Sequence, residues 1–207
     1  MRSNRGVLVI ACGALAREIA ALRRANNWLE LDVCYLPPEL HNRPERIAAA
    51  VRGKIHENRA RYASIFVAYG DCGTGGRLDA MLAAEGVERI PGAHCYEFFA
   101  SPEVFSALAE SEPGTFYLTD FLVRHFDRLV TRSLGLDRHP ELACLYFGNY
   151  RKIVYLAQAP CANSLAKAQA IALDMGLAFE FKFTGYGALA ANLGRVTEAS
   201  RASAWQA

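Results

Sequence analysis

The chain has 207 residues, of which 52% are apolar, so it is long enough to bury a sizeable core as one domain or two small ones. Its 23 basic and 21 acidic residues nearly cancel. This balance excludes a strong global field that would attract nucleic acid, an anionic membrane or an acidic substrate, so recognition has to be local.

The sequence contains no run near the roughly 20 apolar residues that span a bilayer. The apolar run after Arg5 is also too short for a secretory signal. We therefore expect a cytoplasmic protein with no membrane partner. Because that compartment is reducing, the six cysteines are more naturally thiols or metal ligands than a disulfide framework. They occupy positions 12, 34, 72, 95, 144 and 161.

The first half of the chain alternates short apolar runs with segments of helical spacing. In chain order the pattern predicts a strand at 7–12, a helix at 14–26, a strand at 29–36, a helix at 44–60, a strand at 64–69 and a short helix at 78–85. Residues 89–90 are a candidate for one further, very short strand.

The second half repeats this alternation. It predicts helices at 96–99 and 102–109, a strand at 114–119, a long helix at 121–134, a strand at 152–156, a helix at 164–175 and a strand at 177–183. The fold class is therefore α/β: a mostly parallel sheet with helices on both faces, in a Rossmann-like three-layer architecture. We expect a single domain over residues 1–194 and a frayed C-terminal tail over 195–207.

Parallel sheets bind ligands beside the carboxyl ends of their strands, near a switch in strand order. Cys12 and the loop 69–76 each follow a predicted strand directly, so both should lie at this edge. His94 and Cys95 follow the candidate strand at 89–90 and are expected as their companions. We predict that the loop lines a small-molecule site through Tyr69, Gly70, Asp71, Gly73, Thr74 and Gly75.

Taken alone, the loop resembles the glycine-rich loop of S-adenosylmethionine-dependent methyltransferases, in which glycines let the backbone approach the ligand. That family usually ends its next strand with an acidic residue that binds the ribose. Here the corresponding segment is Ile90-Pro-Gly-Ala-His-Cys95. The glycine spacing also matches neither a Walker sequence nor the G-x-G-x-x-G fingerprint. An S-adenosylmethionine or nucleotide site is therefore the less favoured interpretation.

A metal site is the competing interpretation. Thiolates and imidazoles suit zinc, and three converging cysteines can also hold an iron–sulfur cluster with one iron open. We predict Cys12, Cys72 and Cys95 as metal ligands, and we assign Cys72 and His94 to the chemistry, His94 as a fourth ligand or a proton donor. Unpaired cysteines are often simply buried, and Cys34, Cys144 and Cys161 are assigned that role. The remaining histidines lie in polar surroundings and need no function: His41, His56 and His139.

With these residues in view, the chain resembles a prokaryotic family known as domain of unknown function 1638. The resemblance covers almost the whole chain. It lies in Val9-Ile-Ala-Cys12, Tyr69-Gly-Asp-Cys-Gly-Thr-Gly75, Ile90-Pro-Gly-Ala-His-Cys95, Pro113-Gly-Thr-Phe-Tyr-Leu-Thr119 and a strand-helix-strand around 152–193.

The resemblance implies a compact α/β fold and a frequent association with corrinoid-dependent methyltransferases of one-carbon metabolism. The chain departs from the family pattern at two places. Members tend to have an aspartate between the histidine and the cysteine that are adjacent here as His94 and Cys95. They also typically carry Asp-Thr-Gly near the C-terminal strand, where this chain has Ala157-Gln-Ala159.

The leading functional hypothesis is a metal-thiolate protein, with zinc or an iron–sulfur cluster, that acts in or alongside corrinoid-dependent methyl transfer as a metal-dependent methyltransferase. Its expected partners are a corrinoid protein or a corrinoid-dependent methyltransferase, and a small-molecule ligand. Two alternatives remain open. One is a non-enzymatic accessory protein whose cysteines serve only folding, and the other is an S-adenosylmethionine-binding methyltransferase.

Overall fold

The chain forms two compact units in a computed structural model that describes residues 5–204. Unit 1 contains the chain up to Phe98 together with the segment from Gly187 onward, and unit 2 contains Phe99–Tyr186. The sequence had suggested a single domain over 1–194. The division arises because the chain builds the second parallel sheet entirely between leaving unit 1 and returning to it.

Unit 1 is built on a four-stranded sheet of order β2-β1-β3-β4 in which every neighbouring pair is parallel. The side chains of β1 from Val7 to Ala11 are buried on both faces, as expected for the central strand of a covered parallel sheet. The strands are β1 (Arg5–Cys12), β2 (Leu31–Leu36), β3 (Tyr62–Ala68) and β4 (Glu88–Arg89).

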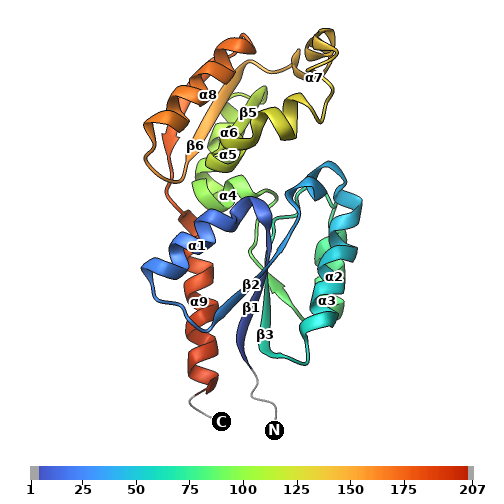
Figure 1. Cartoon of the computed structure of the whole chain (residues 1–207), viewed down its shortest axis with the longest axis vertical. Coiled ribbons are helices and arrows are strands. Elements are labelled where there is room, and N and C mark those ends of the chain that lie inside the picture. The colour runs from blue at the N-terminus through green and yellow to red at the C-terminus, as the bar shows by residue number, and fades with distance from the viewer. Residues whose placement is uncertain (1–4, 205–207) are drawn as a thin grey trace. The chain divides into compact units, whose positions relative to one another are not determined.

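Helices cover both faces of this sheet: α2 and α3 lie on one side, and α1 and α9 on the other (Figure 1). Apolar residues at helical spacing explain the packing, since Ile47, Val51 and Ile55 form the fully buried stripe of α2. The helices of unit 1 are α1 (Ala16–Ala25), α2 (Ile47–Asn58), α3 (Arg77–Glu85) and α9 (Gly187–Ala204), and the division between the units falls within α4 (Cys95–Ala100).

The helix α9 extends through most of the segment expected to be a frayed tail. Its residues Leu189 and Leu193 are fully buried, and the helix contacts β1 and β3. Burial continues past Gly194 at Val196, Thr197 and Ser200, so residues 195–204 belong to the packed helix. The last part of the predicted tail, 205–207, lies outside the described residues.

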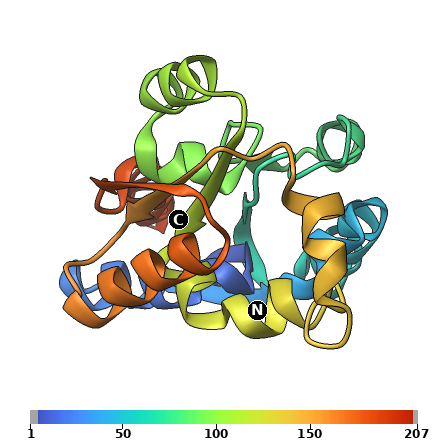
Figure 2. The ribbon, with the colours of Figure 1, turned by 90° about the horizontal axis from the view of Figure 1, so that it is seen from above.

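Unit 2 contains a three-stranded parallel sheet of order β5-β6-β7. Its core packs Leu118, Tyr155 and Ile171 together, between the sheet and the helices α6 and α8. These two helices contact each other and can be followed in Figure 2 by their yellow-green and orange colours. The elements are α5 (Pro102–Ser111), β5 (Thr115–Thr119), α6 (Asp120–Phe126), α7 (Ala143–Phe147), β6 (Lys152–Ala157), α8 (Ala162–Asp174) and β7 (Ala178–Phe183).

The long helix predicted at 121–134 is interrupted. The Thr119 hydroxyl starts α6 by accepting the Leu122 N–H at 3.3 Å. The helix then leaves helical geometry at His125, with φ −113° and ψ 16°, and continues as one π-helical turn over Asp127–Thr131. Apolar spacing alone does not reveal such a change of hydrogen-bond pattern.

The expected α/β fold with parallel strands and helices on both faces is confirmed, with its strands divided over two sheets. Among the helices of residues 5–204, none combines the length and the apolar character required to cross a bilayer.

Candidate functional site

The strand order of unit 1 creates the switch that the sequence predicted. From β1 the chain goes to β2 on one side and then to β3 on the other, so the order reverses between β1 and β3. Cys12 is the last residue of β1, and the loop after β3 carries Cys72. Ligands of open parallel sheets bind in the crevice outside such a reversal, so both predicted cysteines are at the favoured place.

Cys12 is the last residue of β1 and is 3% exposed. Its extended backbone ends the strand, and its Sγ accepts a hydrogen bond from the Ala14 N–H at 3.4 Å, at the start of a short 3₁₀ turn. Burial raises the pKa of this thiol to about 12, although the Ala14 N–H and the Tyr69 hydroxyl lower it in part. The thiol is therefore neutral unless a cation stabilises its thiolate.

The loop after β3 is held together by the carboxylate of Asp71. It accepts hydrogen bonds from the Gly75 and Gly76 N–H groups, at 3.0 and 2.9 Å, and from the Thr74 hydroxyl. The Thr74 hydrogen bond is the main cause of the lowered pKa of Asp71. Asp71 therefore holds the loop together as far as Gly76, the residue before α3, and its contact with a substrate remains a prediction.

Four residues of this loop adopt left-handed backbone conformations. Cys72 has φ 49°, and the three glycines at positions 73, 75 and 76 have φ values of 82°, 62° and 80°. A cysteine pays a steric cost in this region that glycine does not. The hydrogen bonds of the loop, described above for Asp71, therefore hold the Cys72 backbone in this unfavourable conformation.

The loop after β3 is joined to the loop after β4. The Asp71 N–H donates to the Gly92 carbonyl at 3.1 Å, and the Cys72 N–H donates to the Ala93 carbonyl at 2.8 Å. Gly70 lies so close to the next residue of that loop that a Cβ would come within 3.1 Å of the His94 backbone. These contacts bring the predicted His94-Cys95 segment beside Cys72.

The structure brings Cys12, Cys72 and Cys95 together, and we call these three residues the thiol cluster. In their ionised forms the three thiols are close enough to interact electrostatically with one another, and the Cys95 backbone donates a hydrogen bond to the Cys72 thiol. Burial is the largest cause of the raised pKa of all three thiols; it raises the pKa of Cys72 to about 11 and that of Cys95 well above its ordinary value. Both residues are partly buried.

The hydroxyl of Tyr69 lies among these thiols. The residue is 1% exposed, and its pKa is raised mainly by burial and then by the charge of Cys12, with Cys72 and Cys95 contributing further. Although the hydroxyl interacts with the Cys12 sulfur, it makes no hydrogen bond of ordinary geometry within the described part of the chain. A buried phenol in this state has hydrogen-bonding capacity to spare.

His41 is a member of the site that the sequence interpretation missed. It lies on the 3₁₀ turn Pro38–Asn42 after β2, with its Nδ1 3.8 Å from the Cys12 Sγ and 3.1 Å from the Pro38 carbonyl. Its ring stacks on Tyr69, with centroids 6.1 Å apart. Burial lowers its pKa, so the imidazole is neutral and can bind a metal or accept a proton. Its position after a strand of the same parallel sheet was the available signal.

His94 itself is exposed at the surface of the site, with its ring 6.2 Å from that of Tyr96. Its charge interacts with that of His41 and lowers the pKa of the buried ring. Within residues 5–204, the side chains as placed form no group of three His, Cys, Asp or Glu with the spacing that a metal ion requires. Cys12, Cys72 and Cys95 lie close together without forming a ready metal site, so their role as ligands remains a prediction.

The remaining cysteines are outside the thiol cluster. Cys34 lies in β2 and is half-buried, whereas Cys144 and Cys161 are exposed, so the expectation that these two are buried is wrong. Cys161 caps the start of α8, where hydrogen bonds from Ser164 lower its pKa. Cys161 is exposed because it lies in the turn between β6 and α8.

A family model described as "Protein of unknown function (DUF1638)" matches residues 35–193. No curated protein matches the chain. Among solved structures, an ornithine carbamoyltransferase from Pyrococcus furiosus is similar, with 13% identity and a TM-score of 0.25. The similarity covers 87% of this chain and 55% of that one, so the chain spans about half the length of that relative. The family model covers most of the chain, and the chain belongs to the DUF1638 family of proteins of unknown function.

Proposed function

We propose that unit 1 binds a thiophilic metal centre, a zinc ion or an iron–sulfur cluster, through the thiol cluster, and that this centre serves corrinoid-linked methyl transfer in one-carbon metabolism. One observation carries the metal proposal. Three cysteines, at the end of β1, in the loop after β3 and at the start of α4, lie together beside the switch point of a parallel sheet, and none of them is in a disulfide.

The donor set suits this chemistry. Thiolate sulfur and imidazole nitrogen are the preferred ligands of zinc, and three cysteines leave one position of a zinc ion or one iron of a cluster open to substrate. A further donor close to the cluster is His41, whose Nδ1 lies 3.8 Å from the Cys12 sulfur. Because the described side chains are not spaced as a ready ligand group, binding requires these cysteines to change rotamer.

Several residues of this chain would support such a centre. The Tyr69 hydroxyl can donate a hydrogen bond to a thiolate, which a buried neutral phenol does at little cost. The exposed His94 can exchange a proton between the site and solvent. Bound zinc supplies Lewis acidity and lowers the pKa of a coordinated thiol, which makes that thiol a methyl acceptor.

The metal proposal is tested on protein purified without oxygen, by elemental analysis and visible absorbance. We expect about one zinc ion or one cluster per chain, as a fully assembled site requires. Replacing any thiol-cluster residue by serine should abolish binding. The matched controls are Cys34→Ser and Cys144→Ser, which should leave the metal content unchanged. Metal-free protein that stays folded and never binds either centre on reconstitution would overturn the proposal.

The methyl-transfer proposal needs a separate assay. Wild-type protein and Cys72→Ser would be incubated with a methylated corrinoid protein and a thiol acceptor, and loss of the methyl–cobalt absorbance would be followed. Turnover that disappears in Cys72→Ser supports the proposal. Stable co-purification with a corrinoid protein or its methyltransferase, without turnover in any variant, would instead identify an accessory protein.

A further inference from the structure

The edge strand β7 has features of an interface. It is the last strand of the unit 2 sheet and, within residues 5–204, pairs only with β6. Its sequence Ala-Phe-Glu-Phe-Lys-Phe places three phenylalanines on one face and two opposite charges on the other. Two of these rings are unusually exposed for large apolar side chains: Phe181 by 47% and Phe183 by 57%. Exposed apolar edge strands are templates for pairing with another strand.

The hydrogen-bond pattern shows which residues of β7 face outward. Ala178 N–H donates to the Arg151 carbonyl at 3.1 Å, and Thr184 N–H donates to the Ala157 carbonyl at 2.9 Å. Even-numbered residues therefore direct their backbone groups toward β6. Because these groups alternate along a strand, the odd-numbered residues 179, 181 and 183 direct theirs toward the free edge.

This alternation limits how a second copy of β7 could pair. In an antiparallel pair, outward-facing residues must oppose outward-facing residues to form hydrogen bonds. A two-fold axis at Phe181 satisfies this condition and places Phe181 opposite its own copy. It also places Glu180 opposite Lys182 of the partner strand, twice by symmetry. Both attractive contacts fall at non-hydrogen-bonded positions, where opposing side chains are closest.

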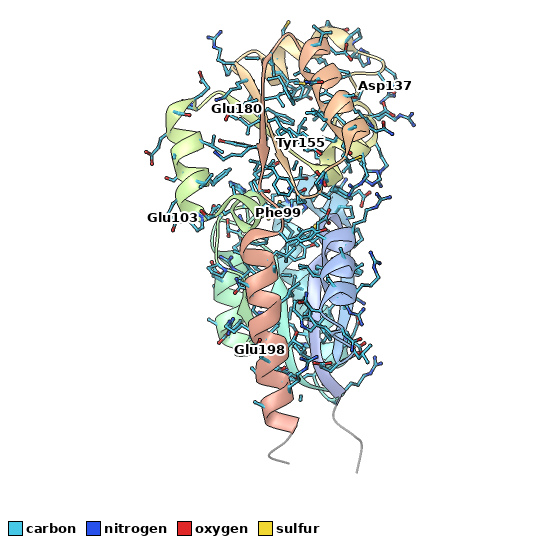
Figure 3. The ribbon with its side chains drawn as sticks, turned by 90° about the vertical axis from the view of Figure 1, so that its left-hand side faces the viewer. Phe99, Glu103, Asp137, Tyr155, Glu180 and Glu198 are labelled. Atoms are coloured by element: carbon cyan, nitrogen blue, oxygen red, sulfur yellow. The ribbon has the colours of Figure 1, made fainter. Side chains whose placement is uncertain are left out.

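The neighbouring two-fold registers are unfavourable. Moving the two-fold axis to residue 180 places Glu180 opposite Glu180, and moving it to residue 182 places Lys182 opposite Lys182. Like charges directly opposite one another destabilise a sheet. The charge pattern thus selects a single self-complementary register. In the isolated chain the Glu180 carboxylate, labelled in Figure 3, lies 2.8 Å from the Lys152 ammonium on β6 and remains 40% exposed for a second cation.

We propose that β7 pairs antiparallel with β7 of a second copy of this chain, with the two-fold axis at Phe181. The two three-stranded sheets then form one continuous sheet, and the exposed phenylalanines pack across the axis. A two-fold interface of this kind is self-complementary and closed, so association stops at a dimer.

The first test uses charge reversal and sedimentation analysis over a concentration series. Glu180→Lys and Lys182→Glu each convert both cross-strand contacts to repulsion and should weaken the dimer by at least about tenfold. The double variant Glu180→Lys/Lys182→Glu exchanges the positions of the two charges, so opposite charges again face each other, and it should restore dimerisation. Lys167→Glu on α8 makes the same charge change away from the edge and should have no effect.

The second test reports the register directly. In a Cys144→Ser/Cys161→Ser background, Phe181→Cys should form an intermolecular disulfide, because opposed residues have Cα atoms about 5.5 Å apart. Phe183→Cys is the matched control: it is opposite position 179 of the partner and should not cross-link. Three results would each overturn the proposal: a wild-type protein that stays monomeric, a dimer affinity that Lys182→Glu leaves unchanged, or equal cross-linking at positions 181 and 183.

Discussion

The buried carboxylate of Asp120 makes a sharp prediction about unit 2. The residue is 4% exposed and accepts hydrogen bonds from the Tyr155 hydroxyl at 2.6 Å, the Gln158 N–H at 3.2 Å and the Ala159 N–H at 3.0 Å. Tyr155, labelled in Figure 3, is itself 1% exposed. This network ties the end of β5 to the turn after β6.

Removing the tyrosine hydroxyl deletes one hydrogen bond to a charged acceptor, so Tyr155→Phe should lower the free energy of unfolding by about 2 kcal/mol. Asp120→Ala deprives three buried donors of their acceptor and should cost about 4 kcal/mol. Once Asp120 is absent, the hydroxyl keeps only its interaction with Ser164. Tyr155→Phe in the Asp120→Ala background should then cost close to zero, which gives a coupling of about 2 kcal/mol.

The measurement is native-state hydrogen exchange of residues 99–186, because urea unfolding followed over the whole chain would mix two units. Tyr146→Phe is the control, since that tyrosine is 43% exposed and its loss should change stability by less than about 0.5 kcal/mol. If Tyr155→Phe costs the same in both backgrounds, the hydroxyl and the carboxylate are not partners and the reasoning is refuted.

Three further predictions concern unit 1 and the thiols. Gly70→Ala should lower the free energy of unfolding by about 2 kcal/mol, because the new Cβ would lie 3.1 Å from backbone. Gly53→Ala on α2 meets nothing within 4 Å and should raise it by about 0.5 kcal/mol; equal effects on native-state hydrogen exchange of unit 1 would contradict this contrast. Iodoacetamide near neutral pH should label Cys161 first and the thiol cluster last, as mass spectrometry of peptides can measure, and the reverse order would contradict the burial of the cluster. Finally, metal-free protein should lose stability as pH rises above 9.0, because the unfolded thiols release protons that the folded ones retain up to a pKa of about 11 at Cys72 and about 12 at Cys12. A Cys72→Ser variant should lose less, and unfolding free energies independent of pH across this window would exclude the effect.

The sequence correctly predicted the location of residues whose place in the fold depends only on where a strand ends. Cys12 and Cys72 were placed correctly at one sheet edge because each directly follows an apolar run, and parallel strands all end at the same edge. The position of Cys95 beside them depends on the two-residue strand β4, which periodicity alone could only suggest.

Other features depend on tertiary contacts that local patterns do not contain. His41 has polar sequence neighbours, and its contact with Cys12 exists only because β2 and β1 are adjacent. The helix α9 is rich in small residues, so its packed face gave a weak periodic signal before the sheet was known. Exposure of Cys161 likewise depends on where the turn after β6 ends and α8 begins.

The return of the chain to unit 1 through α9 has a consequence for biosynthesis. The strands that present the thiol cluster are translated first, but the helix that packs on β1 and β3 is translated only after all of unit 2. At typical elongation rates of about 5–20 residues per second, that interval is on the order of 5–20 s. During it, the cysteines are on an incompletely covered sheet. The sheet that presents the thiol cluster is therefore fully covered only late, once α9 has been translated and has packed on β1 and β3.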